Sequence, residues 1–510
     1  MKTKRGKVYL VGGGPGDAGL LTLRGAECLR LADVVLYDGL VNPLLLRHSK
    51  ATTQRTCRTT GPAGRTLNQT EINSRLIEEA QQGKIVVRLK GGDPFIFGRG
   101  SEEAAALAKA GIPFEVIPGI TAATAAGAYT GISLTHRNFS SAVAFITGHE
   151  DPAKKESSLD YKQLAQFPGT LVFYMGLHRL GKIINSLLQH GLKKTTPASV
   201  VSRASTSAQQ TISAPLHLLA EKVRHANLHA PSLIIIGDCV LQREEISWFE
   251  SRPLLGKRIG ITRPVGQAEE AIQRCIALGA EPVLLPMIEI LPPDNWTEVD
   301  LAIEQLAKKH HDKGKKYDWL IFTSANGVEG LMQRLWDNKK DSRLLAAVNI
   351  AVIGPATAAA LEKYHLRADL MPKQYQAEGL VAALKNHVAG KQLLWAGANR
   401  GREVLQQELT AAGANIDKIV VYRNEDILIS ADDISKKNLD WIGLSSPSIA
   451  RRFASIYEEE QEQNSKLRLA AISPVTAESL SKTGWQVDAI ATSHTWEGLL
   501  EAVVKAESER

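Results

Sequence analysis

The chain has 510 residues, of which 44% are hydrophobic and 23% are charged, and its 61 Lys and Arg against 54 Asp and Glu give a formal net charge of +7. These values are typical of chains that bury a core, and they exclude a disordered or fibrous protein. The length predicts three or four globular units at about 150 residues per domain. The charge surplus is mild, and aromatic residues make up only 5% of the chain. Because few aromatic side chains are available to stack on bases, a nucleic-acid partner is disfavoured. A mild positive charge suits an anionic small molecule.

The four cysteines lie far apart and form no CxxC pair: Cys28, Cys57, Cys239 and Cys275. This spacing argues against a disulfide framework or a zinc site and favours a reducing cytosol. The first residues run from a basic stretch directly into a short strand, without the apolar segment of a signal peptide. The longest uncharged run, 116–135, is rich in Gly, Thr and Ser and makes a poor membrane helix. We therefore expect a cytoplasmic protein with no membrane partner.

Strand-like and helix-like runs alternate along the whole chain, which is the pattern of an α/β architecture. In chain order the first half is predicted as strand 7–11, helix 20–31, strands 34–38 and 85–90, helix 101–111, strand 114–117, and strands 142–147, 169–175 and 231–238. Residues 246–254 are charged and lack a clear apolar period, so they are predicted as a linker. A new strand-and-turn unit begins directly after them.

The second half contains an internal duplication. Residues 351–384 match residues 470–503 without a gap, and residues 318–328 match residues 440–450. We therefore expect two similar α/β lobes with a ligand between them. The equivalent turns place Ser or Thr between a strand and a helix start, where hydroxyl and backbone N–H groups can meet an anion. Each of these residues singly is equally consistent with an ordinary helix N-cap.

Three glycine-rich turns follow predicted strands in the first half: VGGGPGD at 11–17, KGGDPFIFGRG at 90–100 and PGITAA at 118–123. The first turn disfavours dinucleotide binding, because Asp17 would oppose a pyrophosphate at the helix start. Gly91 and Gly92 permit a positive φ, and Asp93 beside them can receive an amino group or a ribose. Met175 stands alone in a strand-like run, where methionine usually fills a core.

Eight motifs of the first half occur in a family order: GGGPGDAGLLT, ADVVLYDGLV, QTEIN, GGDPFIFGRG, PGITAA, GISLTHR, GTLVFYMG and PSLIIIGD. Over about residues 5–245 the chain resembles the uroporphyrinogen-III C-methyltransferases. The resemblance implies a two-lobed α/β fold of the tetrapyrrole methylase type, a homodimer through this half, S-adenosylmethionine as methyl donor and no metal. It also implies that nine residues line the cofactor pocket: Pro15, Gly91, Gly92, Asp93, Ile96, Thr121, Ala122, Met175 and Ala204.

The same resemblance implies that Asp38 is the proton acceptor of the methylation, with a cap in the strand-to-loop turn as the alternative role. Thr60 stands where the family commonly has a lysine proposed as proton donor. Either that lysine is dispensable, or Arg58 or Arg65 replaces it.

The motifs ITRP, DWLIFTSANGV, IGPATAAAL, MPKQYQAEGL, VVYRNE and SSPS resemble uroporphyrinogen-III synthase over roughly residues 256–505. The resemblance implies a second two-lobed α/β fold, with lobe one at about 255–290 plus 424–505 and lobe two at about 291–423. It implies closure of hydroxymethylbilane without a cofactor, and six substrate-binding residues in the matching turns: Thr323, Ser324, Asn326, Thr357, Ser446 and Thr476. Tyr422 matches a tyrosine that assists loss of the hydroxyl, or it packs at a strand end. LLWAGANRGRE departs from the family's common PRA.

The expected product of the second half is the substrate of the first. We therefore predict a bifunctional enzyme, with the methyltransferase at 1–245, the linker at 246–254 and the synthase at 255–510. It would make precorrin-2 from hydroxymethylbilane through uroporphyrinogen III, towards sirohaem or cobalamin-type cofactors. The alternative is a methyltransferase whose synthase half is an inactive tetrapyrrole-binding module.

Overall fold

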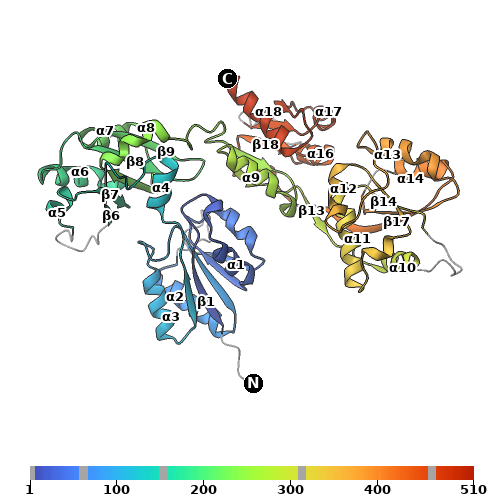
Figure 1. Cartoon of the computed structure of the whole chain (residues 1–510), viewed down its shortest axis with the longest axis horizontal. Coiled ribbons are helices and arrows are strands. Elements are labelled where there is room, and N and C mark those ends of the chain that lie inside the picture. The colour runs from blue at the N-terminus through green and yellow to red at the C-terminus, as the bar shows by residue number, and fades with distance from the viewer. Residues whose placement is uncertain are drawn as a thin grey trace. The chain divides into compact units, whose positions relative to one another are not determined.

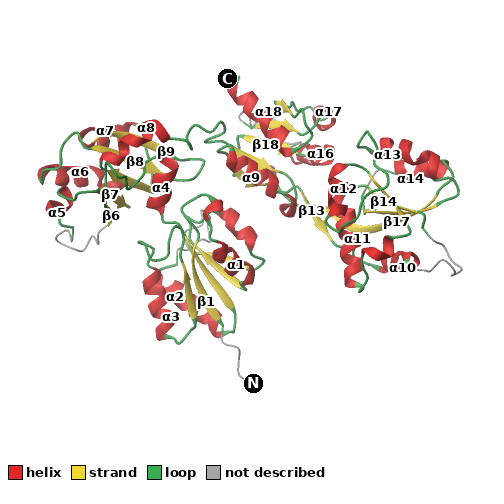
Figure 2. Cartoon of the chain, viewed as in Figure 1, coloured by secondary structure: helices red, strands yellow, loops and turns green. Residues whose placement is uncertain are grey.

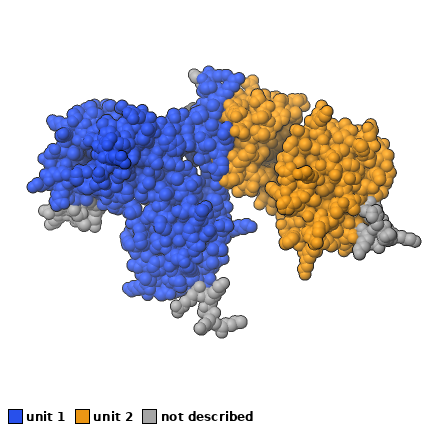
Figure 3. All heavy atoms as spheres, viewed as in Figure 1, with its two compact units in different colours: residues 1–259, 273–282, 504–510 blue, residues 260–272, 283–503 orange. Residues whose placement is uncertain are grey.

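The computed structural model describes residues 6–56, 67–148, 159–307, 317–400, 403–457 and 467–509. Thr60, Arg58 and Arg65 lie outside these ranges. The chain divides into two compact units, drawn in different colours in Figure 3. Unit 1 comprises residues 1–259, 273–282 and 504–510, and unit 2 comprises residues 260–272 and 283–503.

The first sheet of unit 1 holds five parallel strands in the order β3-β2-β4-β1-β5. Its elements are β1 (Lys7–Gly12), α1 (Leu23–Leu31), β2 (Val34–Tyr37), β3 (Thr52–Arg55), α2 (Gln69–Gln81), β4 (Ile85–Lys90), α3 (Gly100–Lys109) and β5 (Phe114–Ile117). In Figure 1 the labels α1, α2 and α3 stand beside the sheet that is marked β1. The apolar runs of β1, β2 and β4 are almost wholly buried, as helices on a parallel sheet require. β3 was not predicted, because its sequence TTQR is polar and every residue of this edge strand is exposed. The carboxyl ends of all five strands meet at one edge, where α/β sheets bind ligands.

The second sheet of unit 1 has the order β6-β7-β10-β8-β9 and mixes parallel and antiparallel pairs. Its strands are β6 (Val143–Thr147), β7 (Thr170–Tyr174), β8 (Pro197–Ser202), β9 (Gln210–Pro215) and β10 (Ser232–Ile236). The accompanying helices are α4 (Ala122–Thr130), α5 (Tyr161–Ala165), α6 (Leu180–Gln189), α7 (Leu216–His225) and α8 (Arg243–Ile246). Helices and strands of this half are distinguished by colour in Figure 2.

The segment 246–254 belongs to unit 1 and contacts other residues of that unit. The Phe249 side chain is buried, and its ring centroid lies 4.8 Å from that of Tyr129. Glu250 accepts hydrogen bonds from Gln209 at 2.9 Å and from Thr211 at 2.5 Å. These contacts fix the path of the connection where the sequence shows only a charged stretch.

The second half of the chain forms two further five-stranded sheets, in the orders β12-β11-β18-β19-β20 and β13-β17-β16-β14-β15. The first sheet contains β11 (Arg258–Ile261), β12 (Glu281–Leu284), β18 (Trp441–Leu444), β19 (Arg468–Ala471) and β20 (Ala489–Ile490), with helices α9 (Glu269–Ala277), α15 (Ala431–Ser435), α16 (Pro447–Ile456), α17 (Pro474–Ser481) and α18 (Trp496–Ser508). The second contains β13 (Ile288–Leu291), β14 (Trp319–Phe322), β15 (Asn349–Val352), β16 (Gln392–Ala398) and β17 (Asn415–Asp426), with helices α10 (Thr297–Leu306), α11 (Ala325–Asp337), α12 (Pro355–Glu362), α13 (Ala377–Leu384) and α14 (Val404–Ala411).

The duplicated sequence has duplicated contacts. β14 pairs with β15 and β18 pairs with β19, both in parallel. After each pair an aspartate accepts a backbone N–H bond from the second strand: Asp369 from Ile350 at 2.7 Å, and Asp488 from Leu469 at 2.8 Å. The gap-free match between residues 351–384 and 470–503 thus reflects one substructure formed twice.

The α/β fold class is confirmed, with sheets covered by helices in both halves. Across the six described ranges, no helix is both long and apolar enough to cross a membrane.

Candidate functional site

The loops after β1 and β4 are joined by a pair of backbone hydrogen bonds between two glycines. The Gly92 N–H donates to the Gly14 carbonyl at 2.8 Å, and the Gly14 N–H donates to the Gly92 carbonyl at 3.2 Å. Both residues have a positive φ, +76° for Gly14 and +69° for Gly92, which a residue with a side chain rarely adopts. The glycines therefore bring the backbones of two predicted cofactor loops into direct contact.

The loop after β5 completes this arrangement. A Cβ atom on Gly119 would lie 2.3 Å from the Gly92 carbonyl oxygen and 2.7 Å from the Gly12 Cα atom, so the three loops leave no room for a side chain there. The Asp93 carboxylate accepts hydrogen bonds from the backbone N–H groups of Gly119 at 3.0 Å and Phe95 at 2.8 Å. Asp93 thus ties two of the loops together.

The second sheet contributes Tyr174 and Met175 at the end of β7. The Tyr174 hydroxyl lies 2.7 Å from the Thr121 hydroxyl and accepts the Ala123 backbone N–H at 3.0 Å. Met175 has a φ of +55° and its side chain is 51% exposed. A strained, exposed methionine does not fill the core, which removes the packing interpretation of this residue.

The loop after β1 also contacts the loop after β8. The Asp17 backbone N–H donates to the Ser205 hydroxyl at 3.2 Å, and a Cβ atom on Gly16 would lie 2.9 Å from the Ala204 carbonyl oxygen. The Tyr129 hydroxyl donates to the Asp17 carboxylate at 2.6 Å. Burial and this hydrogen bond raise the pKa of Tyr129. Asp17 is therefore a structural acceptor here.

Eight of the nine predicted cofactor residues lie within or beside these contacts, on the loops after β1, β4, β5, β7 and β8 and, for Ala122, at the first residue of α4: Pro15, Gly91, Gly92, Asp93, Thr121, Ala122, Met175 and Ala204. The ninth, Ile96, lies farther along the loop after β4 and is 38% exposed.

Backbone strain marks the same loops. Among residues other than glycine in the described ranges, positive φ values occur at four helix C-terminal ends and at five loop positions: Phe97, Arg99, Met175, Arg203 and Ser205. Each such residue costs about 1–3 kcal/mol, and such strain clusters at functional sites. Sequence reasoning missed four of the five, because neither their residue types nor their spacing signals a left-handed conformation.

Asp38 lies directly after β2, with its side chain 29% exposed. Its Oδ1 atom accepts hydrogen bonds from Arg88 Nη2 and, at 3.0 Å, from the Thr56 hydroxyl. The Lys90 ammonium lies 3.9 Å from Oδ2. The capping role at the next helical turn belongs to Asn42, which accepts the Leu44 N–H at 3.0 Å.

In the second half, the predicted substrate residues lie at helix starts on two sheets. Ser324 and Ser446 are N-caps of α11 and α16, accepting backbone N–H bonds from Gly327 at 3.1 Å and Ile449 at 3.3 Å. Thr357 and Thr476 lie in the first turns of α12 and α17 and are 3% and 0% exposed. A capping serine keeps its hydroxyl proton for another acceptor.

Tyr422 lies on β17, and its hydroxyl lies 2.8 Å from the Ser324 hydroxyl. The side chain is 8% exposed, and burial raises its pKa. Thr323 accepts the Trp395 indole N–H at 3.2 Å, and Asn326 accepts a hydrogen bond from Gln267 at 2.6 Å. The structure thus brings Ser324 and Tyr422 together, whereas Ser446 and Thr476 belong to the other sheet.

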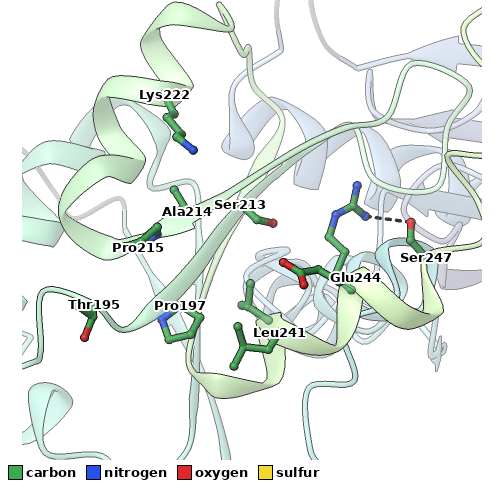
Figure 4. Close-up of a pocket in the computed structure, with 11 residues that line it drawn as sticks. Thr195, Pro197, Ser213, Ala214, Pro215, Lys222, Leu241, Glu244 and Ser247 are labelled. Atoms are coloured by element: carbon green, nitrogen blue, oxygen red, sulfur yellow. Dashed lines mark hydrogen bonds between the residues drawn. The ribbon is translucent and has the colours of Figure 1, made fainter.

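A separate pocket of about 430 Å³ lies beside β8, β9, α7 and α8 (Figure 4). Its lining includes Lys222, Arg243 and Glu244, and none of the residues predicted for either site. No group of three or more His, Cys, Asp or Glu side chains within the described ranges is placed to hold a metal ion.

Two family models match the chain. One, described as Tetrapyrrole (Corrin/Porphyrin) Methylases, matches residues 7–220, and the other, described as Uroporphyrinogen-III synthase HemD, matches residues 269–501. The porphyrin biosynthesis protein HemD of Ruminiclostridium josui is 33% identical over 486 residues, 94% of this chain and 94% of that protein. The chain belongs to the HemD family. As a HemD-family member it is a bifunctional enzyme of tetrapyrrole synthesis, with a methyltransferase domain before a uroporphyrinogen-III synthase domain.

Two further relatives of this HemD-family chain match its first half. The siroheme synthase of Zymomonas mobilis is 49% identical over 249 residues, 49% of this chain and 52% of that protein, so this chain spans about half its length. A crystal structure of uroporphyrin-III C-methyltransferase from Thermus thermophilus, complexed with S-adenyl homocysteine, is 37% identical and covers 46% of this chain and 99% of that chain, with a TM-score of 0.40. Both resemblances stated from the sequence are confirmed at the level of family.

Proposed function

We propose that this enzyme closes hydroxymethylbilane to uroporphyrinogen III with inversion of the last ring, and then methylates C2 and C7 of that product to form precorrin-2. The observation that carries the proposal is the presence of both family domains in one chain, in an arrangement that a relative shares over 94% of its length. The product of the synthase reaction is the substrate of the methyltransferase. The shared length disfavours the alternative in which the second half is only a binding module.

S-adenosylmethionine is the methyl donor in this proposal, and its methyl group is already activated by the sulfonium. The residues present suit such a ligand, because Gly14 and Gly92 place no side chain on two of the loops and the Met175 side chain, at the end of β7, is exposed. We assign Pro15 and the loop after β4, with Thr121, to holding the donor. Positioning its methyl group in line with a pyrrole carbon supplies much of the acceleration.

Asp38 is the proposed proton acceptor. A pyrrole carbon becomes a stronger nucleophile as its ring N–H loses or shares its proton, and a carboxylate at that N–H stabilises the charge. Oδ1 of Asp38 already accepts hydrogen bonds from Arg88 and Thr56. We therefore assign Oδ2 as the oxygen that contacts the substrate N–H. Homodimerisation through this half and a cytoplasmic location remain predictions from the family resemblance, and light scattering of the purified chain tests the first.

The synthase half must hold hydroxymethylbilane, a flexible molecule that bears eight carboxylates. It must also favour attack by one particular carbon of the last ring on the carbon that loses the hydroxyl group. The Ser324 and Ser446 hydroxyls, and backbone N–H groups at the starts of α11, α12, α16 and α17, are donors suited to carboxylates, whereas the Thr357 and Thr476 side chains are buried. We propose that the Tyr422 hydroxyl donates a proton to the hydroxyl group of hydroxymethylbilane, which then leaves as water. The raised pKa of Tyr422, caused by burial, keeps the phenol protonated through neutral pH.

Tyr422→Phe is expected to lower the rate of enzymatic cyclisation by about 100-fold or more, since one general acid is lost. Because spontaneous closure gives isomer I, the product should shift from isomer III towards isomer I, and chromatography of the oxidised products measures this shift. Methylation of supplied uroporphyrinogen III should not change. A variant that still makes isomer III at the normal rate would refute the role of Tyr422.

Product analysis of purified protein with fresh hydroxymethylbilane tests the whole proposal. Isomer III without S-adenosylmethionine, and a product two methyl masses heavier with it, are the expected results. Isomer I alone in the first reaction would overturn the synthase assignment. Unmethylated isomer III in the second would overturn the methyltransferase assignment.

A further inference from the structure

A buried ion cluster lies behind Asp38, formed by Arg88 and Lys90 of β4 and Glu103 of α3. These three side chains are 2%, 4% and 0% exposed. Arg88 Nε lies 3.0 Å from Glu103 Oε1, and Lys90 Nζ also lies 3.0 Å from that oxygen. Gln69 donates to the same Oε1 at 3.1 Å. Fully buried charges of this kind are costly unless paired, so their presence calls for an explanation.

The cluster is balanced only when Asp38 is included. Arg88 and Lys90 contribute two positive charges, and Glu103 is a single buried carboxylate. Within the described ranges, Glu103 Oε2 is a buried oxygen without a hydrogen-bond partner, so the glutamate does not use its second oxygen to hold either cation. Asp38 supplies the second negative charge, at the edge of the cluster. Burial lowers the pKa of Lys90, with the Arg88 charge acting in the same direction.

Arg88 connects the two carboxylates through different nitrogen atoms. Its Nε donates to Glu103, and its Nη2 donates to Asp38. Because the guanidinium is planar and rigid, anchoring Nε on a helix fixes the direction in which Nη2 points. The Asp38 carboxylate is therefore held from its buried side, while 29% of its side chain stays exposed.

We propose that Arg88 is a positioning residue for methyl transfer: anchored by Glu103, it holds the Asp38 carboxylate in the orientation that meets the substrate N–H. The inference rests on the proposed role of Asp38. Fold stability alone does not require this arrangement, because a buried ion pair is often replaceable by apolar side chains without loss of stability. A fixed carboxylate matters for catalysis, since a misplacement of about 1 Å costs about 100-fold in rate.

The test is Arg88→Lys in the full chain. Lysine keeps the positive charge, but its ammonium is a point charge on a flexible stem and lacks the rigid planar fork through which arginine fixes two carboxylates on separate nitrogens. We expect kcat for methylation of uroporphyrinogen III to fall about 10- to 100-fold. The KM for S-adenosylmethionine, the affinity for S-adenosylhomocysteine and the cyclisation rate should stay within about threefold, since the inference places Arg88 outside donor binding and cyclisation.

The matched control is Arg243→Lys, which alters the part-buried pair of Arg243 with Glu250 in the other lobe of the methyltransferase. Its methylation rate should stay within about threefold of the wild-type rate, because the guanidinium that is lost there has no contact with Asp38. Normal kcat in Arg88→Lys would overturn the inference. If that variant fails to fold or to bind S-adenosylhomocysteine, the Glu103→Gln variant replaces it in the test. We expect its kcat for methylation to fall about three- to tenfold. A normal kcat in Glu103→Gln would overturn the inference.

The double variant Asp38→Asn/Arg88→Lys separates this inference from the proposed function. If Arg88 acts through Asp38, the double variant should be no slower than Asp38→Asn alone, whereas multiplied effects would overturn the positioning role. An Asp38→Asn variant with normal methylation would instead refute the proposed role of Asp38 itself. A slow Asp38→Asn variant with a normal Arg88→Lys variant would refute only the positioning role.

Discussion

Asp38→Asn is expected to reduce methylation of uroporphyrinogen III by about 10²- to 10⁴-fold, the usual contribution of a general base. The amide has nearly the same shape as the carboxylate but cannot accept a proton from the pyrrole N–H. Steady-state transfer of labelled methyl groups from S-adenosylmethionine measures the loss. Cyclisation of hydroxymethylbilane by the same preparation should be unchanged, because the synthase residues lie on other sheets.

Binding of S-adenosylhomocysteine controls for folding of the Asp38→Asn variant. Its affinity should be unchanged, since no donor contact is assigned to Asp38. An equal loss of methylation and cyclisation would contradict the claim of two separate sites. A methylation rate within threefold of the wild type would show that Asp38 only anchors the buried cluster.

Gly119→Ala is expected to weaken S-adenosylhomocysteine binding by tenfold or more and to lower the melting temperature. The added Cβ would lie 2.3 Å from the Gly92 carbonyl oxygen, so a backbone must move. Overpacking of this kind costs about 1–3 kcal/mol. The movement falls on the loops assigned to the methyl donor, so affinity should fall together with stability. Calorimetric titration and thermal unfolding measure the two effects.

Gly181→Ala is the matched control for Gly119→Ala. Gly181 lies in α6, and an added Cβ there meets no atom within 4 Å. Alanine is favoured over glycine in a helix by about 1 kcal/mol, so this variant should be as stable as the wild type or more stable. Its affinity for S-adenosylhomocysteine should not change. Normal affinity in Gly119→Ala would contradict the placement of the donor site.

Much of the methyltransferase fold could be predicted because its signals are local. The apolar runs of β1 and β7 are continuous, and glycine-rich turns follow β1 and β4. The duplication in the second half predicted two similar substructures, since a gap-free repeat preserves the spacing of strand, turn and helix. The domain and lobe boundaries stay predictions; in the sheet itself β11 lies next to β18.

The cluster behind Asp38 could not be predicted, because its parts are brought together only by tertiary packing. Arg88 and Lys90 alternate with apolar residues in a central strand. From the sequence alone, this pattern is equally consistent with charged side chains that are exposed to solvent. Glu103 lies in the first turn of α3, where an acidic residue is favoured by the helix dipole alone. Their mutual contacts depend on how α3 crosses the sheet. The left-handed conformations of Phe97 and Arg99 were not predicted, because phenylalanine and arginine are not residue types that favour a positive φ.

The strand order of the sheet around β11 bears on how the chain emerges from the ribosome. β11 and β12 are synthesised first, but β18, the neighbour of β11 on its other side, follows only after the whole of the sheet from β13 to β17. Until residue 444 has left the exit tunnel, one side of β11 has no strand to pair with, and unpaired edges recruit other chains. The methyltransferase sheets are complete much sooner, because β10, which pairs with β7 and β8, ends at Ile236, and domains fold from the N-terminus as they emerge. Ribosome stalling or a premature stop late in the message should therefore leave a folded methyltransferase attached to an aggregation-prone remainder.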